Sequence, residues 1–577
     1  MKDYQLEYSK WLQHETLDES LLKELKEIHN QSEEIAERFH KDLEFGTGGL
    51  RGIISAGTNR INIYTIRKAT LGLANYIISQ GPKAMKQGVA IAYDSRKFSK
   101  EFAEEAAKVL ATKNIQVYLF SELKPTPLLS FAVRKLGAYS GIVITASHNP
   151  PEYNGYKVYN QFGGQVTEEI VADIYEQIAL IEDVLYFDVV DLQSGMDSGL
   201  ITVLQDEIDQ EYLQAVEQLQ LNKELTKKNG GQVTIVYTPL HGTGNKLVRR
   251  ILAQAGFTNV YVVPEQEHPD AEFRTVAAPN PEDLSVFALA EILAKQQEAD
   301  IIMATDPDAD RLGVLVKNAK GDYQGLSGNQ LGALILNYLL EERKKANRLP
   351  VNGVLLKTIV TSELGQRIAE KYQVQTVNTL TGFKYIGEKI REFELSKQYS
   401  FLFGYEESYG FLAYDIARDK DAVQIAGLVA EMVLKYKLLG KNLFEVLEDI
   451  YQEHSFHVED LIAKTFSGIE GSKRIEQIVG FFRENPLKNI NGIPVVGLED
   501  YLKGQKIAYP TSTVTEITLP KANVLKILLA DGSWIAVRPS GTEPKIKFYV
   551  AVVADKYSFA LTKLEKLKEE ILKMISI

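Results

Sequence analysis

One order of predicted elements, strand–helix–strand–helix–strand, recurs three times along the chain and limits its fold more than any other feature. The first copy has strands at 89–93, 117–120 and 141–144 and helices at 100–112 and 127–136. The second has strands at 233–237, 260–263 and 300–304 and helices at 244–255 and 282–297. The third has strands at 353–359, 374–377 and 399–403 and helices at 361–372 and 383–393. Apolar strands alternating with helices predict parallel sheets joined by right-handed crossovers, and so an α/β fold.

The two ends of the chain differ from these repeats. Residues 4–41 carry helical periodicity with charged faces. After about residue 445, strands at 456–458, 513–519 and 524–529 alternate apolar and polar residues, and helices are expected at 469–484 and 557–574. That alternation is typical of an antiparallel sheet with one solvated face. We therefore predict three similar mixed or parallel β-α-β-α-β domains and a C-terminal α+β domain. The predicted domains span residues 1–205, 206–320, 321–450 and 451–577.

Composition restricts the partners of the protein. The 577 residues include 65 basic and 77 acidic side chains, a formal charge of −12, and no Lys/Arg-rich run. Nucleic acid and anionic membranes are therefore poor partners, and an anionic substrate must be met by local positive charge. A polar N-terminus and the lack of 18 consecutive apolar residues argue against a signal peptide or a membrane span. The absence of cysteine excludes disulfides and thiolate metal sites. We expect a cytoplasmic enzyme.

A first polar motif follows the apolar run 141–144 and reads Thr-Ala-Ser-His-Asn at 145–149, followed by Pro150. A buried strand that stops in such a turn leaves the hydroxyl of Ser147 at its carboxyl end, where open α/β sheets bind ligands. Ser147 is therefore a candidate nucleophile for group transfer. The alternative is a helix cap or turn residue. His148 is either structural or orients a phosphate and relays a proton.

A second motif, Asp306-Pro-Asp308-Ala-Asp310-Arg311, follows the strand at 300–304. Alternate carboxylates in an extended loop can converge on one hard cation, and oxygen ligands favour Mg²⁺. A calcium-binding EF-hand loop is excluded, because Arg311 stands where glycine is required and Lys317 where glutamate is required. A solvated acidic turn is the remaining alternative. The guanidinium of Arg311 cannot bind a cation and suits a phosphate oxygen.

Two further motifs carry groups that could bind a sugar phosphate. Glu406 and Ser408 follow the strand at 399–403 and could bridge neighbouring sugar hydroxyls; a charged turn is the alternative, and Glu407 fits that description. The late loop combines a guanidinium, hydroxyls and a glycine that together can cradle a dianionic phosphate. Its residues are Arg538, Ser540, Gly541 and Thr542, and Lys545 and Lys547 could add positive charge.

These four motifs, in this order and over almost the whole chain, resemble the α-D-phosphohexomutase superfamily and in particular its phosphoglucomutase/phosphomannomutase family. The resemblance implies a heart-shaped, four-domain protein with a phosphoserine at Ser147. It implies Mg²⁺ bound by Ser147, Asp306, Asp308 and Asp310, and a metal site that depends on Ser147 being phosphorylated. It also implies sugar contacts from Thr381, Gly382 and Lys384, a proton carrier at Lys420, and an arginine near the reacting phosphate at Arg51.

The activity that the resemblance implies is interconversion of α-D-glucose 1-phosphate and glucose 6-phosphate through bound glucose 1,6-bisphosphate. Several alternatives remain open: a phosphomannomutase, a phosphopentomutase, a glucose 1,6-bisphosphate synthase, or a non-catalytic sugar-phosphate sensor. The intact Ser147 and the complete aspartate set argue against a sensor. The expected partner is a small-molecule sugar phosphate, and the protein is expected to be a monomer or a dimer.

Overall fold

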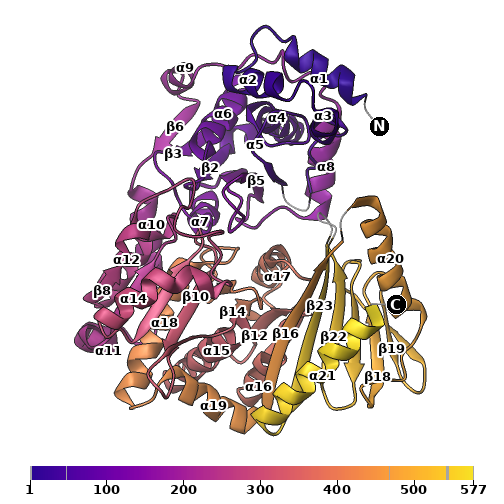
Figure 1. The fold of residues 1–577 in the computed structure, drawn as a ribbon. Coiled ribbons are helices and arrows are strands. Elements are labelled where there is room, and N and C mark those ends of the chain that lie inside the picture. Colours follow the sequence, from indigo (N-terminus) through magenta and orange to yellow (C-terminus); the bar gives the residue numbers. More distant parts are fainter. Residues whose placement is uncertain (1–2, 47–48, 467, 541–544, 576–577) are drawn as a thin grey trace. The chain divides into compact units, whose positions relative to one another are not determined.

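The computed structural model describes residues 3–46, 49–466, 468–540 and 545–575 (Figure 1). Its contacts divide the chain into two compact units. The first comprises Met1–Leu331, Glu342–Gly353 and Phe383–Asn442, and the second comprises Gly332–Glu341, Val354–Gly382 and Leu443–Ile577. Each unit is therefore built from separate stretches of sequence.

The N-terminal helical periodicity is confirmed as three short helices, α1 (Tyr4–Leu12), α2 (Glu19–Glu27) and α3 (Ser32–Phe39). The side chains of Asp3 and Asp18 accept hydrogen bonds from the first backbone amides of α1 and α2, and this capping fixes where both helices begin. Trp11, Leu25 and Phe39 form a separate small core with Tyr64 of the following helix. The three helices thus pack as one group against the first sheet domain.

The first sheet domain confirms the predicted first copy. Its elements are β1 (Gly49–Ile53), α4 (Ile63–Ser79), α5 (Pro82–Gln87), β2 (Val89–Tyr93), α6 (Ser99–Thr112), β3 (Val117–Phe120), α7 (Thr126–Leu136), β4 (Ser140–Ile144), β5 (Tyr153–Asn160), α8 (Glu168–Ala179), α9 (Leu192–Asp197) and β6 (Ile201–Leu204). The sheet order is β1-β5-β4-β2-β3-β6. Strands β2, β3, β4 and β6 pair in parallel, whereas β5 and β1 are antiparallel.

The second copy forms a five-stranded sheet in the order β11-β10-β9-β7-β8. Its elements are α10 (Glu207–Leu219), α11 (Lys223–Asn229), a 3-10 turn η1 (Gly230–Gln232), β7 (Thr234–Thr238), α12 (Gly244–Ala255), β8 (Asn259–Val262), α13 (Pro264–Glu267), η2 (Leu284–Phe287), α14 (Ala288–Gln296), β9 (Ile301–Thr305), β10 (Leu312–Lys317) and β11 (Tyr323–Gly325). The helix predicted at 282–297 starts as the 3-10 turn η2, because the Asp283 side chain accepts from the backbone of Ser285 and tightens the first turn.

The third copy contributes elements to both compact units. They are α15 (Gly328–Lys345), β12 (Gly353–Thr358), α16 (Leu364–Lys371), β13 (Gln375–Thr379), α17 (Phe383–Ser396), β14 (Ser400–Tyr405), β15 (Phe411–Leu412), α18 (Ala422–Leu438) and α19 (Leu443–His454). Strands β12 and β13 are parallel in the second unit, and β14 and β15 are antiparallel in the first. The predicted helix 361–372 begins only at Leu364, because Thr361 first closes a turn onto the carbonyl of Thr358.

The C-terminal part is the predicted α+β domain. Its elements are β16 (Phe456–Thr465), α20 (Gly468–Glu484), β17 (Asn489–Ile490), β18 (Ile493–Asp500), β19 (Gln505–Ala508), β20 (Thr513–Glu516), β21 (Leu525–Leu529), β22 (Trp534–Pro539), β23 (Lys545–Ala554) and α21 (Tyr557–Ile575). The antiparallel order is β16-β23-β22-β21-β18-β19-β20, with β17 on β18, and α21 packs on β16 and β23.

The sheets are mixed, one of the two predicted forms, and the strand that follows each motif is the antiparallel one. Strands β4, β9 and β14 each continue through a polar motif into an antiparallel neighbour, namely β5, β10 and β15. Each motif is therefore the turn of a β-hairpin at the end of a buried strand. A polar loop of a few residues can only reverse the chain, since a parallel return needs a longer crossover.

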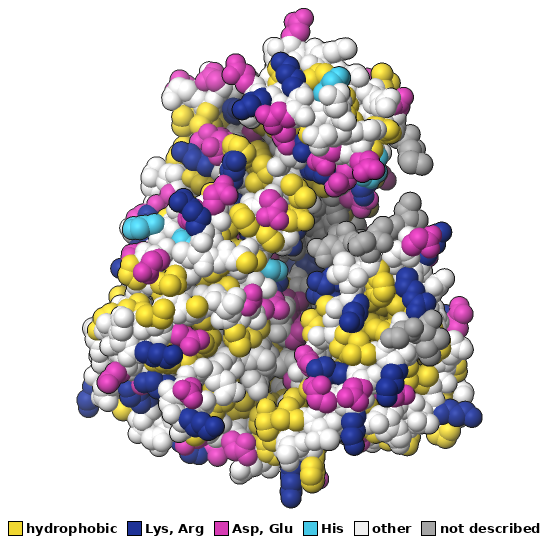
Figure 2. All heavy atoms as spheres, in the orientation of Figure 1, with side chains coloured by type: hydrophobic (Ala, Val, Ile, Leu, Met, Phe, Trp, Pro, Cys, Tyr) yellow, Lys and Arg dark blue, Asp and Glu magenta, His cyan; other side chains and the backbone are white. Residues whose placement is uncertain are grey.

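The surface carries charge of both signs. On the face shown in Figure 2, Lys and Arg side chains are interspersed with Asp and Glu rather than gathered into one field. Among the described helices, none combines the length and the apolar composition needed to cross a bilayer.

Candidate active site

Ser147 occupies a strained position just beyond the buried strand β4. Its φ of 53° lies in the left-handed region, which is costly for a residue with a side chain and is often found at functional sites. The backbone N–H of Ser147 donates to the Thr145 hydroxyl at 2.8 Å, which holds the turn. The Ser147 hydroxyl lies 2.8 Å from Oδ2 of Asp306 and 3.2 Å from Nδ1 of His148. The first and second sequence motifs therefore meet.

A buried arginine holds this loop from behind. The guanidinium of Arg96 donates to the carbonyls of Ser147 at 2.7 Å, Pro150 at 2.8 Å and Tyr153 at 3.0 Å, and also to that of Asn149. The carboxylate of Asp94 lies 3.4 Å from Arg96 Nε, and neither side chain is exposed. Sequence reasoning missed this pair, although a strand that ends in Asp-Ser-Arg at 94–96 carried the same signal as the other motifs.

The three aspartates of the second motif converge, and all are buried. Oδ1 of Asp306 accepts the backbone amides of Asp310 and Arg311 at 3.1 and 3.0 Å, which leaves Oδ2 facing Ser147. Oδ1 of Asp308 and Oδ1 of Asp310 have no hydrogen-bond donor in the described part of the chain. Buried carboxylate oxygens without donors, grouped beside a hydroxyl, have the chemistry of a site for a hard cation.

Charges around the loop shift the carboxylates in opposite directions. Burial and the neighbouring Asp308 and Asp310 raise the pKa of Asp306 well above its usual range. Burial would also raise the pKa of Asp308, but the ammonium of Lys157 outweighs it and lowers that pKa. Like charges held this close disfavour one another, and a cation bound between them would relieve that repulsion.

Lys157 and Thr126 supply part of that compensation and were not predicted. Lys157 Nζ lies 2.8 Å from Oδ2 of Asp308 and 3.5 Å from Oδ2 of Asp310, and the Thr126 hydroxyl donates to Asp308 Oδ2 at 2.8 Å. Lys157 stands in β5, and Thr126 begins α7. A lone lysine within the apolar run at 156–158 was the available signal; Thr126 gave none beyond its place before Pro127.

Lys420 lies between the second motif, residues 306–311 (here called the cation loop), and the third motif. Its Nζ lies 3.1 Å from Oδ2 of Asp310 and 2.9 Å from Oδ1 of Asp419. Burial alone would lower the pKa of Lys420, but the charges of Asp310, Asp419 and Glu406 outweigh it and raise that pKa. Lys420 is therefore an ammonium at neutral pH. A Cβ on Gly410 would lie 2.8 Å from Cγ of Lys420, so a larger residue there would force the Lys420 side chain to shift.

The third motif lies at the carboxyl end of β14. The Glu406 side chain is buried, its backbone amide donates to the Gly410 carbonyl at 2.9 Å, and Ser408 is half-buried in the same turn. Arg311, at the end of the cation loop, forms an isolated bridge with Gly410. The turn with Glu406 and Ser408 therefore lies against the cation loop.

Three further predicted residues lie around this centre. Burial lowers the pKa of His148 well below its usual value, and the positive charges of Arg311 and Arg51 add to the effect. Arg51 is exposed on β1 and donates to Oδ1 of Asn149 at 3.2 Å. Arg311 forms an ion pair with Glu282. The imidazole of His148 is therefore neutral near pH 7, and a phosphate would compete with Glu282 for Arg311.

Of the remaining predicted residues, Lys384 belongs to the same unit as Ser147, but its ammonium pairs with a carboxylate outside the motifs. Lys384, at the start of α17, forms an ion pair with Glu168 at 2.7 Å. Thr381, Gly382, Arg538, Ser540 and Lys547 belong to the second unit. Arg538 and Lys547 are cross-strand partners on β22 and β23, and the Ser540 amide donates to the Lys545 carbonyl at 2.7 Å. Gly541 and Thr542 lie outside the described residues.

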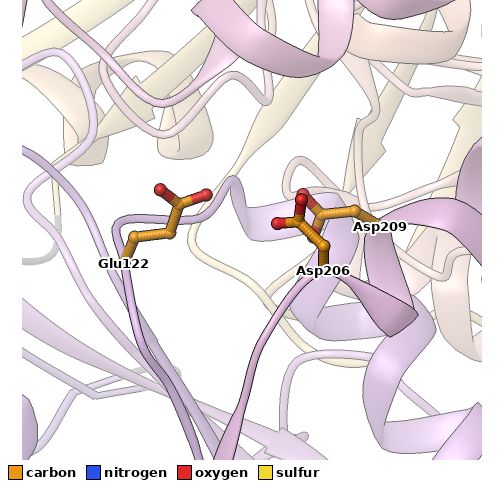
Figure 3. A group of neighbouring side chains, drawn as sticks. All are labelled: Glu122, Asp206 and Asp209. Carbon is orange, nitrogen blue, oxygen red and sulfur yellow. The ribbon is translucent and has the colours of Figure 1, made fainter.

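A second group of acidic side chains lies away from the motifs. Glu122, in the loop after β3, faces Asp206 and Asp209 at the start of α10 (Figure 3). Lys124 already fills this group, with Nζ 2.9 Å from Glu122 and 2.7 Å from Asp209. Lys246 pairs with Glu122, and Arg250 lies 3.7 Å from Asp209. Three cations thus surround Glu122 and Asp209.

Comparisons with known proteins give matches over most of the chain. Models of the phosphoglucomutase/phosphomannomutase family match as alpha/beta/alpha domain I over residues 42–184, domain II over 210–321, domain III over 327–454 and the C-terminal domain over 491–568. A phosphoglucomutase of Staphylococcus epidermidis (strain ATCC 35984) is 40% identical over 551 residues, which are 95% of this chain and 98% of that protein. One from Staphylococcus aureus (strain MRSA252) is 39% identical over 530 residues, 92% and 93% of the two chains.

Two solved structures share the fold. The open form of parafusin, a phosphoglucomutase from Paramecium, has a TM-score of 0.69 at 18% identity and covers 92% of this chain and 95% of its own. A phosphoglucomutase/phosphomannomutase family protein from Burkholderia thailandensis has a TM-score of 0.64 at 17% identity, with 92% and 97% covered.

Proposed function

Because the chain belongs to the phosphoglucomutase/phosphomannomutase family and is a phosphohexomutase, we propose that it interconverts α-D-glucose 1-phosphate and glucose 6-phosphate through a phosphoserine at Ser147. The observation that carries this proposal is the position of the Ser147 hydroxyl, 2.8 Å from one of three converging aspartates. Relatives of about 40% identity that are named phosphoglucomutase support glucose as the sugar.

The proposed reaction consists of two transfers through the same serine. The bond from Ser147 Oγ to phosphorus breaks, and a bond forms from phosphorus to the free hydroxyl of the sugar phosphate, which loses its proton. The product is glucose 1,6-bisphosphate, which then reverses its orientation within the site. In the reverse step its other phosphoryl group returns to Ser147 Oγ and the released sugar oxygen gains a proton. The enzyme thus regains its phosphate, and no net phosphate is consumed.

Residues of the site divide the supporting roles. Asp306, Asp308, Asp310 and Ser147 would hold Mg²⁺, which withdraws charge from the phosphoserine oxygens. His148, 3.2 Å from the Ser147 hydroxyl, is proposed to relay a proton, and Lys420 is proposed to carry one. Arg51 and Arg311 are proposed to meet the reacting phosphate. Glu406 and Ser408, with Thr381, Gly382 and Lys384, are proposed to bind sugar hydroxyls, and the Arg538 loop the distal phosphate.

Replacement of the proposed nucleophile tests the mechanism. Ser147→Ala removes the covalent carrier, so mutase turnover should fall by several orders of magnitude. Intact-mass analysis of active wild-type protein should show one added phosphate on a peptide that contains Ser147. Ser140→Ala, on the same buried strand, is the matched control and should keep most of the activity. Near-normal turnover of the Ser147 variant would exclude the phosphoserine.

The sugar preference is tested separately. Coupled assays with glucose, mannose, ribose and N-acetylglucosamine 1-phosphates should give the highest kcat/KM for glucose. A preference for the pentose would favour a phosphopentomutase, and a preference for mannose a phosphomannomutase. Accumulation of free glucose 1,6-bisphosphate would favour a bisphosphate synthase. Binding without turnover would indicate a sensor. Cytoplasmic location and a monomeric or dimeric state remain proposals from the sequence.

A further inference from the structure

Thr126 makes an unusual double contact with the cation loop. It is fully buried at the start of α7, and its backbone N–H donates to the backbone carbonyl of Asp308 at 2.9 Å. Its hydroxyl donates to Oδ2 of the same aspartate at 2.8 Å. Thr126 thereby fixes both the backbone carbonyl and the carboxylate of Asp308, which lies 182 positions further along the chain.

These contacts select which oxygen of Asp308 remains available. Oδ2 also accepts from Lys157 Nζ at 2.8 Å, whereas Oδ1 has no hydrogen-bond donor among the described residues. Two donors on one oxygen stop the carboxylate from rotating about its last bond. Oδ1 is therefore oriented before any cation binds, and second-sphere hydrogen bonds of this kind tune metal affinity.

Lys124, two residues before Thr126, is held by the acidic group of Figure 3. Lys124, only 2% exposed, places its ammonium 2.7 Å from Asp209 and 2.9 Å from Glu122, and its backbone amide donates to the Tyr93 carbonyl at 3.0 Å. Pro125 separates Lys124 from Thr126 and restricts the backbone between them. Because Lys124 already occupies the acidic group, that group is better suited to anchor the segment than to bind a metal.

We propose that residues 122–126 form a strap that orients Asp308 for the cation, with Thr126 as the positioning residue and Lys124 as its anchor between Glu122 and Asp209. This inference rests on the proposed function, because the cation is the proposed Mg²⁺. Residues of the first sheet domain would thus orient a metal ligand that belongs to the second.

Thr126→Val is the first test, because it removes the hydroxyl but keeps the shape and the backbone N–H. Mg²⁺ affinity is measured by titration calorimetry and, separately, from the Mg²⁺ concentration that gives half-maximal rate. Loss of a hydrogen bond to a charged group should weaken Mg²⁺ binding about tenfold to a hundredfold. At saturating Mg²⁺, kcat should stay within about threefold of wild type, because Thr126 touches no substrate. Thr126→Ser should restore the affinity.

Two further variants separate the strap from general damage. Thr226→Val removes a buried threonine hydroxyl that donates to the Lys223 carbonyl in its own helical turn and accepts from Gln220, and it should leave Mg²⁺ affinity unchanged. Asp209→Asn weakens the anchor of Lys124 and should weaken Mg²⁺ binding by a smaller factor than Thr126→Val. It keeps the inference testable if the valine variant does not fold.

The outcomes distinguish the two proposals. Wild-type Mg²⁺ affinity in Thr126→Val, or equal losses in Thr126→Val and Thr226→Val, would overturn the strap while leaving the proposed function intact. A wild-type protein that neither binds Mg²⁺ nor needs it would overturn the metal assignment, and the strap with it.

Discussion

At the scale of single residues, the site divides the two oxygens of each aspartate between different tasks. One oxygen of Asp306, Asp308 and Asp310 is bound by backbone amides, Thr126 or lysine, and the other faces Ser147 or has no hydrogen-bond donor in the described chain. Ligands that are oriented before binding lose less freedom when the cation arrives. The aspartate loop therefore depends on its hydrogen-bond partners as much as on its own residues.

The proposed phosphate-binding loop that begins at Arg538 gives a prediction at the same scale. Arg538 and Lys547 are direct cross-strand partners, so their two cationic side chains lie on the same face of the sheet. Arg538→Ala should raise KM for the sugar phosphate about tenfold to a hundredfold, because a bidentate contact to phosphate is lost in ground and transition states alike. Steady-state kinetics check this. Lys506→Ala, which removes a cation paired with Glu499 on the same sheet, serves as control, and an unchanged KM in the Arg538 variant would place the anchor elsewhere.

His457 predicts how stability depends on pH. Burial lowers its pKa from 6.5 to about 4. As pH falls below 6.5, the unfolded chain binds a proton on this residue while the folded protein does not. Stability is thus present above pH 6.5 and is lost as pH falls towards 4, by about 2 kcal/mol at pH 5.

Thermal unfolding of wild type and His457→Gln at pH 7.5 and pH 5 measures this effect. The melting temperature of the variant should fall less on acidification, because all other titrating groups are shared. His268→Gln, whose side chain is exposed, is the control and should behave like wild type. Equal losses in the His457 variant and wild type would show that His457 does not set this pH dependence.

At the scale of elements, each motif is the turn of a hairpin that begins at a buried strand. A buried strand fixes where its last residue lies, and the turn can then hold costly conformations such as the left-handed backbone of Ser147. The fold tolerates that strain because Arg96 ties the same turn down through carbonyls of the loop.

Arg96→Lys tests that role. A lysine keeps the charge but cannot reproduce the planar fork, so several buried carbonyls lose donors at about 1–3 kcal/mol each. The melting temperature should drop by several degrees, and kcat should fall more than tenfold with KM little changed, since Ser147 loses its position rather than the substrate its binding site. Arg60→Lys, another buried arginine but one that pairs with Glu37, should lower stability without that selective loss of kcat. An unchanged kcat in Arg96→Lys would show that the turn around Ser147 does not depend on Arg96.

The sequence predicted helices and strands better than it predicted which side chains contact one another. Strands β2 and β3 and helix α12 agree residue for residue with the prediction, because their apolar periodicity and flanking turn residues are local signals. Lys157, Arg96 and Thr126 were missed because their functions arise from contacts across 51 to 182 positions of sequence. The boundaries near 205, 320 and 450 remain predictions.

At the scale of the whole molecule, the first unit gathers the proposed site from distant segments. Thr126, Ser147, Lys157, the aspartate loop and Lys420 converge by hydrogen bonds and ion pairs. A cation bound there would stabilise the fold that brings these segments together.

Mg²⁺ should therefore protect the protein as well as activate it. Exhaustive chelation with EDTA should abolish activity, and Mg²⁺ at about 100 times its Kd should add about 2.7 kcal/mol of stability and raise the melting temperature. Asp308→Asn should reduce both the protection and the rate. Full activity after chelation would exclude the aspartate loop as a metal site. Equal protection of the Asp308 variant and wild type would place the stabilising ion elsewhere.

The interleaved composition of the two units has a consequence for how a ribosome delivers this chain. The first sheet is complete once β6 emerges at Leu204, yet the first unit still lacks Phe383–Asn442, and the second unit already claims residues from Gly332 onward. A nascent chain that has exposed Ser147 and all three aspartates has not yet made Lys420. The loop with Asp306, Asp308 and Asp310 therefore lacks one of its counter-charges until more than a hundred further codons have been translated. Slow translation in that interval prolongs the period when this nascent protein is most exposed to proteases and chaperones.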